Sequence, residues 1–291
     1  MRWAALNQRG KREQTMSSPK IALVTGASSG FGQLTASSLA DRGYRVFGTS
    51  RREHSTPSNG IAMLRLDVRS DDSVRSCVEQ VMAQVDRIDV LVNNAGQIHA
   101  SVVEETSLEQ AKDILETNFW GAVRVTDAVL PIMRRQRHGH IINMSSLAGL
   151  VGIPGQAFYS ASKFALEGYT EALSMEIEQF DIVVSLIEPG FFKTHLHREM
   201  QRGAIRSDDY ATLREALETT LTVAIEQGDD PHKVAEMIVR IAGTKSPRLR
   251  HRVGNDSIWV PWLRAFLPHK LFRRGMRRRF NIDNPVSRGA A

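Results

Sequence analysis

The chain has 291 residues, of which 42% are hydrophobic and 24% charged, as expected for a globular protein that buries a sizeable core. Its single cysteine, Cys77, excludes an intramolecular disulfide framework and any metal site built from several cysteines. Residues 248–279 contain ten Lys/Arg and one acidic residue, so this segment has a net charge of +9. Since the whole chain has a net charge of +6, the rest of it sums to −3. Because the basic charge is local, we expect no nucleic-acid partner.

Alternating apolar and helical patterns begin at residue 20. Residues 1–19 are polar and basic, and we expect a mobile N-terminal extension, with Met16 as an alternative start and a mitochondrial-type leader as a less favoured interpretation. Helical patterns are predicted from the first strand to about residue 42 and over 70–85, 107–135 and 158–179. Short apolar runs predict strands over 21–26, 44–51, 62–68, 88–96, 139–146 and 181–190. This alternation predicts one α/β domain over 20–291, a doubly wound, Rossmann-type parallel sheet with helices on both faces.

A glycine-rich stretch, "VTGASSGFG" (24–32), joins the first predicted strand to the first helix. Gly26, Gly30 and Gly32 leave room for a diphosphate, and backbone N–H groups at a helix start attract its charge. The spacing is G-x-x-x-G-x-G rather than the commoner G-x-G-x-x-G, and alone it fits a simple turn equally well. Its place after the strand that opens the alternating pattern favours a nucleotide site.

A second stretch, "FYSASKFALEGYTEAL" (158–173), sets Tyr159 and Lys163 four residues apart on one helix face. A nearby ammonium stabilises phenolate, so we expect Lys163 to lower the pKa of Tyr159 and make it a general acid/base. Each residue alone has an ordinary explanation, as a packing tyrosine or a solvated lysine.

Together these motifs resemble the short-chain dehydrogenase/reductase family over residues 20–195. In order along the chain, the matching residues are T-G-x-x-x-G-x-G at Thr25–Gly32, Asp67, N-N-A-G at Asn93–Gly96, Asn118, Ser146 with Tyr159 and Lys163, and Pro189, Gly190 and Thr194. The 13-residue spacing to the tyrosine selects Ser146 over Ser145, whose side chain strand alternation sends to the opposite face.

The resemblance implies a redox enzyme that interconverts a ketone or aldehyde and an alcohol with a nicotinamide cofactor. The implied catalytic set is Asn118, Ser146, Tyr159 and Lys163: Ser146 hydrogen-bonds the substrate oxygen, and Asn118 holds a water that links Lys163 to solvent. Lys163 also bridges the nicotinamide ribose. The implied cofactor contacts are Gly26, Ser28, Ser29, Gly30, Phe31 and Gly32 for the diphosphate, Asp67 and Val68 for adenine, Asn94, Ala95 and Gly96 for the ribose, and Tyr159, Pro189, Gly190 and Thr194. Family members commonly pair through the helices that begin near 107 and 158, so a homodimer or homotetramer is expected.

The end of the second strand, "GTSRRE", bears on the choice of cofactor. NAD-specific folds place a carboxylate there, whereas this chain has Ser50, followed by Arg51 and Arg52. A guanidinium binds a 2′-phosphate, so we expect NADP(H) to be preferred over NAD(H). Glu53 is a rival carboxylate, and NAD(H) stays open.

Residues from about 191 to 228 are predicted to form a substrate lid. Phe158, Phe191 and Phe192 are predicted to contact substrate beside Ser146 and Tyr159, with Trp120, Leu196 and Met200 as further candidates, or as packing residues. His195 and His197 are too few for a metal site, and none is predicted. A bulky apolar substrate of steroid, retinoid or polyketide size is favoured over a small ketone. A non-catalytic dinucleotide sensor that binds a partner, and an isomerase or dehydratase, are the alternatives.

The basic, aromatic segment 248–280 has two interpretations. Clustered Trp, Phe and Arg suit a peripheral membrane contact. They equally suit a lid or subunit-interface segment, which we favour because Pro261 and Pro268 should interrupt a long helix. We therefore expect a cytoplasmic protein, and association with a membrane is the alternative.

Overall fold

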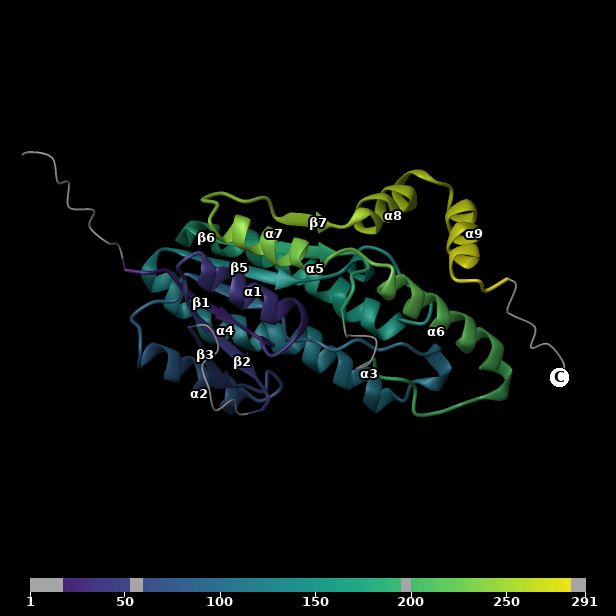
Figure 1. Cartoon of the computed structure of the whole chain (residues 1–291), viewed down its shortest axis with the longest axis horizontal. Helices are drawn as coiled ribbons and strands as arrows, with labels where there is room; N and C mark the ends of the chain where they lie inside the picture. Colours follow the sequence, from purple (N-terminus) through teal and green to yellow (C-terminus); the bar gives the residue numbers. More distant parts are fainter. Residues whose placement is uncertain (1–17, 53–59, 195–199, 284–291) are drawn as a thin grey trace, which may run out of the picture.

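The computed structural model describes residues 18–52, 60–194 and 200–283. Seven parallel strands form one sheet in the order β3-β2-β1-β4-β5-β6-β7 (Figure 1). The strands are β1 (Ile21–Val24), β2 (Arg45–Ser50), β3 (Ile61–Arg65), β4 (Val90–Asn93), β5 (Gly139–Met144), β6 (Ile182–Pro189) and β7 (Arg250–Val253). The predicted fold class is confirmed. Residues 1–17 of the predicted extension lie outside the described residues, as do Glu53, His195, Leu196 and His197.

The six predicted strands are all present, and each is shorter than its apolar run. The seventh, β7, was not predicted because its sequence, RHRV, is mostly charged. Arg250 and Arg252 of this edge strand form ion pairs with Glu188 on β6, at 3.5 and 3.4 Å. The charges are therefore compensated by the neighbouring strand, and a hydrophobicity pattern does not reveal them.

Helices cover both faces of the sheet. On one face α1 (Gly30–Asp41) and α7 (His232–Ala242) pack against strand residues such as Val24 and Val92. On the other, α2 (Asp71–Met82), α4 (Gly121–Gln136) and α5 (Ala157–Ile177) pack against Leu23 and Leu91. Alternate residues of each strand thus pack into two separate hydrophobic cores, one on each face of the sheet, as a doubly wound sheet requires.

The long helix predicted over 107–135 contains an irregular turn. It begins as α3 (Leu108–Leu115), passes through the π-helical turn η2 (Glu116–Trp120) and continues as α4. Ser107 and Gln110 form a capping box at its start. The wide turn contains Asn118, and such turns inside helices are frequent at functional sites.

The predicted lid segment leaves the body after β6 and returns to it. Its helix, α6 (Ala211–Glu226), ends where Asp229 N donates to the Phe191 carbonyl at 3.0 Å and Lys193 N donates to the Asp229 carbonyl at 3.0 Å. Between these ends, Ala100 N donates to the Gln201 carbonyl at 2.9 Å. The segment is thus tied at its base and to the chain that follows β4.

The C-terminal segment forms two helices, α8 (Asn255–Phe266) and α9 (His269–Arg279). The prediction that Pro261 interrupts a helix is wrong, because α8 runs through it, whereas Pro268 does separate α8 from α9. Figure 1 shows both helices at the end of the molecule where α6 lies. None of the helices described is both long and apolar enough to cross a bilayer.

Candidate active site

The carboxyl ends of β1 and β4 mark the point where the strand order reverses, the usual ligand crevice of such sheets. The glycine loop lies there and leads into α1. Gly26 and Gly30 adopt positive φ angles of 66° and 54°, which favour glycine. A Cβ on Gly32 would lie 2.2 Å from the Gly26 carbonyl oxygen, so the loop closes tightly only with glycine there.

Residues of the N-N-A-G segment hold this loop in place. The Asn94 side-chain amide donates to the carbonyls of Thr25 and Gly26, at 2.9 and 3.1 Å. The Thr25 hydroxyl accepts from the backbone N–H groups of Asn94 and Ala95, both at 2.9 Å. Asn94 thus braces the loop, and a backbone-lined cradle remains at the start of α1, where Ser28 and Ser29 are exposed. These features fit a dinucleotide diphosphate.

The other predicted cofactor residues surround this crevice at the ends of neighbouring strands. Ser50 ends β2, with its hydroxyl donating to the Arg52 carbonyl at 2.7 Å, while Arg51 and Arg52 are exposed. Asp67 pairs with Arg69 at 3.2 Å, and this bond lowers the pKa of the Asp67 carboxyl. Val68 is buried, Gly96 is exposed, Pro189 is the last residue of β6, and Gly190 and Thr194 follow it.

Tyr159 lies near the start of α5, next to Ser146. Ser146 follows the end of β5 and its hydroxyl accepts from Ala148 N at 3.1 Å. The Ser146 side chain lies close enough to the Tyr159 phenol to lower the pKa of that phenol, against the effect of burial. Ser145 is buried on the other side, where its Oγ lies 2.6 Å from a Cβ built on Gly149. The structure therefore brings Ser146, and not Ser145, to the phenol.

Lys163 is buried beneath Tyr159. Its Nζ donates to the Met144 carbonyl at 2.8 Å and lies 5.7 Å from the centre of the Tyr159 ring. Asn118, also buried, donates to the Gln97 carbonyl at 2.9 Å and to the Ser162 hydroxyl at 3.1 Å. Asn118 therefore contacts the helical turn between Tyr159 and Lys163. Its role in a water relay stays a prediction.

We expected Lys163 to lower the pKa of Tyr159, but in the protein without cofactor this pKa is raised. Burial raises the pKa of Tyr159, and the neighbouring Ser146 side chain only opposes this rise. Burial also lowers the pKa of Lys163 to about 8, and Glu167 opposes that fall. Removal from water disfavours both charged forms, and it is the largest effect on each pKa.

An apolar cluster surrounds Tyr159 beyond the carboxyl edge of the sheet. We call it the edge cluster. Its buried residues are Ile98, Ala100, Leu147, Ala148, Val151, Ile153, Met200, Leu217, Leu221 and Phe280, and those packed against it include Tyr159, Phe191, Leu213, Val260, Phe272 and Met276. Phe191 and Met200 were predicted here. Val260, Phe272, Met276 and Phe280 were not, because their segment follows Tyr159 by about a hundred residues.

Phe192 lies elsewhere. It is 3% exposed, belongs to the core beneath α1 and α7, and contacts Phe31 edge-to-face at 5.6 Å. The structure thus gives Phe192 a packing role, and the prediction that it contacts substrate is not supported. Phe158 is half-buried, and Trp120 is exposed beside Phe119.

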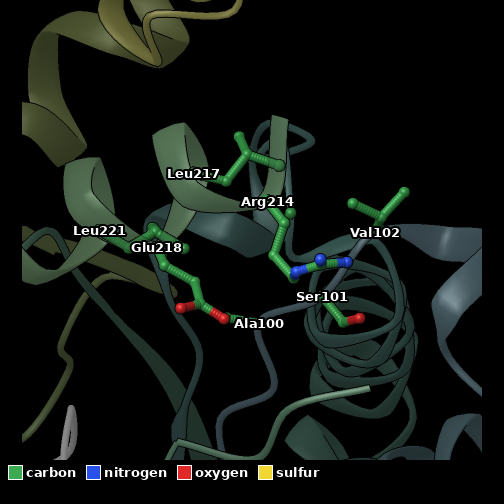
Figure 2. A pocket seen from close by; sticks show the side chains of 8 residues that line it. Ala100, Ser101, Val102, Arg214, Leu217, Glu218 and Leu221 are labelled. Atoms are coloured by element: carbon green, nitrogen blue, oxygen red, sulfur yellow. The ribbon is translucent and has the colours of Figure 1, made fainter. Parts of the chain in front are cut away.

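A small pocket lies between α6 and the chain that follows β4. Figure 2 shows seven of its lining residues, Ala100, Ser101, Val102, Arg214, Leu217, Glu218 and Leu221, and Gly155 completes the lining. Arg214 forms an ion pair with buried Glu105, which fixes α6 over this chain. Since Tyr159 is not part of the lining, we regard this pocket as the base of the lid and not as the reaction site.

Two contributions to the site were missed by sequence reasoning. Thr25 joins the glycine loop to the N-N-A-G segment through its hydroxyl. In the sequence, only its position directly before the first glycine of the loop indicates this role. Glu167 is buried four residues after Lys163, and Arg250 contacts it at 3.1 Å. The spacing of Lys163 and Glu167 on one helix face was a usable signal.

A family model described as short chain dehydrogenase matches residues 20–204. The chain belongs to this family, and is an NAD(P)-dependent oxidoreductase acting on alcohol and carbonyl groups.

Three relatives illustrate the similarity. The chain is 43% identical over 243 residues to a 3-ketodihydrosphingosine reductase of Bacteroides thetaiotaomicron, covering 81% of this chain and 88% of the relative. It is 36% identical over 271 residues to retinol dehydrogenase 8 of Bos taurus, covering 86% of each. A crystal structure of a short-chain dehydrogenase from Streptomyces avermitilis superimposes with a TM-score of 0.76 at 32% identity, covering 93% of this chain and all of that one.

Proposed function

We propose that this protein reduces a bulky apolar ketone or aldehyde, or oxidises the corresponding alcohol, with Tyr159 as the general acid/base. The observation that carries the proposal is the closeness of the Ser146 side chain to the Tyr159 phenol at the edge cluster, with the Lys163 ammonium buried below. A phenol and a hydroxyl that converge on one point bind one oxygen well.

The chemistry divides between cofactor and protein. The glycine loop and the start of α1 would hold NADPH, which when bound would supply the hydride. Tyr159 donates the proton that the substrate oxygen takes up, and Ser146 donates a hydrogen bond to the same oxygen. Lys163 stabilises the resulting phenolate. Asn118 holds the turn of α5 that carries Tyr159, through its bond to Ser162.

The NADP(H) preference rests on the end of β2. Arg51 is exposed there, close enough to Asp67 to lower the pKa of its carboxyl. Asp67 is itself paired with Arg69, so its negative charge is largely compensated. A 2′-phosphate at this strand end would meet a guanidinium, which is the arrangement that NADP requires.

The apolar substrate class rests on the composition of the edge cluster. Side chains from β5–α5, α6, α8 and α9 meet Tyr159 there, and their surfaces are hydrocarbon. Burial of an apolar substrate against apolar side chains lowers its free energy, whereas burial of a polar substrate there raises it. Two relatives carry names that denote a ketodihydrosphingosine and retinol, and each of these molecules has a long hydrocarbon portion. A long-chain ketone or a retinoid is therefore the favoured substrate.

A peripheral contact with a lipid surface is part of the proposal. Trp259, Trp262 and Phe266 form a continuous aromatic row on α8, with ring centres 6.1 and 4.9 Å apart, and they are half or more exposed. The inner sides of the two helices, including Val260 and Phe272, pack on the edge cluster. The segment is thus a lid on its inner side, while its outer side is free for a bilayer.

Charge favours a lipid partner for this outer side over a second copy of the chain. Helix α9 carries six Lys/Arg and no acid. Two copies meeting here would bring like charges together, whereas anionic head groups would compensate them. A homodimer or homotetramer is instead proposed to assemble through α5 and the long helix that begins with α3 and continues as α4, as family members commonly do.

Removing one oxygen tests the mechanism. Tyr159→Phe keeps the ring and the packing of the edge cluster but deletes the proton donor, so turnover should fall about a thousandfold or more. NADPH binding, followed by nicotinamide fluorescence, should change little. A variant that retains wild-type turnover would favour the alternatives, a dinucleotide sensor or an isomerase or dehydratase.

Removing one guanidinium tests the cofactor preference. Arg51→Ala should lower kcat/KM with NADPH about tenfold and leave kcat/KM with NADH nearly unchanged, since only NADPH carries the 2′-phosphate. Arg42→Ala, an exposed arginine at the end of α1, is the matched control. Equal effects on both cofactors, or better activity with NADH in the wild type, would contradict the preference.

A series of 2-ketones of increasing chain length tests the substrate class. Because the edge cluster is apolar, kcat/KM should rise by about threefold per added methylene until the site is filled. The reduced nicotinamide absorbance reports each rate. Activity confined to small polar ketones or sugars would instead identify a small-ketone reductase.

Sedimentation with vesicles tests the lipid contact. The protein should pellet with phosphatidylserine vesicles at low salt, and much less with phosphatidylcholine vesicles or at high salt. The double variant Trp259→Ser/Trp262→Ser should bind about tenfold more weakly or worse, whereas Trp120→Ser, another exposed tryptophan, should bind like wild type. Light scattering confirms an unchanged oligomer. Equal binding by both variants would exclude α8 as the contact.

A further inference from the structure

Lys163 has an ionisable neighbour that the mechanism above does not use. Glu167 follows it by one turn of α5, on the same helix face, and is 6% exposed, as is Lys163. Burial of an ammonium costs free energy unless an opposite charge lies close. Glu167 supplies this charge, and it raises the pKa of Lys163 against the effect of burial.

Arg250 of β7 holds Glu167 from the other side. Its Nε lies 3.1 Å from Glu167 and 3.5 Å from Glu188 of β6, and its Nη2 lies 2.6 Å from Glu171, one turn further along α5. Arg252, also on β7, lies 3.4 Å from Glu188. A charge cluster therefore links the last strand of the sheet to the helix that carries Tyr159.

The cluster distributes its charge unevenly. Burial, together with the negative charge of Glu167, raises the pKa of Glu188 to about 7. Burial also raises the pKa of Glu167, but Arg250 opposes that rise. The Arg250 guanidinium, 3.1 Å from the Glu167 carboxylate, stabilises the charged form of Glu167.

The surroundings of Glu167 are tightly packed on the side of η3 (Leu147–Gly149). A Cβ on Gly149 would lie 3.2 Å from Glu167 Cγ, 3.2 Å from the Lys163 carbonyl and 2.6 Å from Ser145 Oγ. The helix and the turn that carries Ser146 thus meet in direct contact. A charge in such a place is poorly screened by water.

We propose that Glu167, fixed by Arg250, is a positioning residue that keeps Lys163 protonated beneath Tyr159 and so sets the upper pH limit of carbonyl reduction. The proposal rests on the proposed function of Tyr159 and Lys163. It assigns β7 a part in the chemistry, although this strand lies at the edge of the sheet. Glu167 touches neither substrate nor reacting atoms and acts through Lys163 alone.

Glu167→Gln tests this with little change in shape. Without the carboxylate, Lys163 loses its proton at lower pH. The alkaline limb of kcat/KM for reduction should therefore move down by about one pH unit. Glu171→Gln is the matched control, because Glu171 also binds Arg250 but lies on the surface. The alkaline limb of kcat/KM should not move in Glu171→Gln. In Glu167→Asp, which keeps the negative charge, it should stay close to that of the wild type.

A second readout does not depend on catalysis. Trace acetylation with acetic anhydride modifies only neutral amines, so peptide mass spectrometry over a pH series reports the titration of Lys163 directly. Its midpoint should fall by about one unit in Glu167→Gln and not in Glu171→Gln. If Glu167→Gln fails to fold, Glu167→Met, an apolar replacement of similar length, should give the same shift.

The two readouts separate this inference from the proposed function. Should Tyr159→Phe remain active, the proposed function fails while the acetylation midpoint still tests the Glu167–Lys163 coupling. Unchanged midpoints and pH limbs in both uncharged variants would overturn the inference. A shift of equal size in Glu171→Gln would also overturn it, because the effect would then be general to the arginine cluster.

Discussion

The hydrogen bond from Lys163 Nζ to the Met144 carbonyl is the contact on which the site depends. It fastens α5 to the end of β5 and thereby sets Tyr159 beside Ser146, which follows that strand. An ammonium buried at this point is costly, so the fold must supply acceptors and an opposite charge. The Met144 carbonyl is the acceptor and Glu167 is the opposite charge. Together these interactions fix the position of α5 relative to β5.

Much of this was accessible from the sequence. Short apolar runs alternating with helices determine a doubly wound sheet, because parallel strands need long right-handed crossovers. The carboxyl ends of such strands lie at one edge, so Gly26, Ser146 and Gly190, which follow three different strands, had to come close together. The i, i+4 spacing of Tyr159 and Lys163 needed only a helix to bring both to one side.

Other features depend on contacts between distant parts of the chain. Strand β7 has no apolar pattern, because Arg250 and Arg252 are balanced by acids that only the fold brings near. Phe192 looked like a lid residue but faces the core, since the chain pairs with Asp229 as it leaves β6. The pKa of Tyr159 depends on how deeply it is buried, which spacing alone does not state.

Hydride transfer with isotope-labelled cofactor tests the central claim most directly. The enzyme would be supplied with NADPH deuterated at the transferred position and with a long-chain ketone, and the product analysed by mass spectrometry. The account predicts an alcohol that carries deuterium on its carbinol carbon, formed by the wild type and lost in Tyr159→Phe. An unlabelled product, or equal labelling by both proteins, would contradict it.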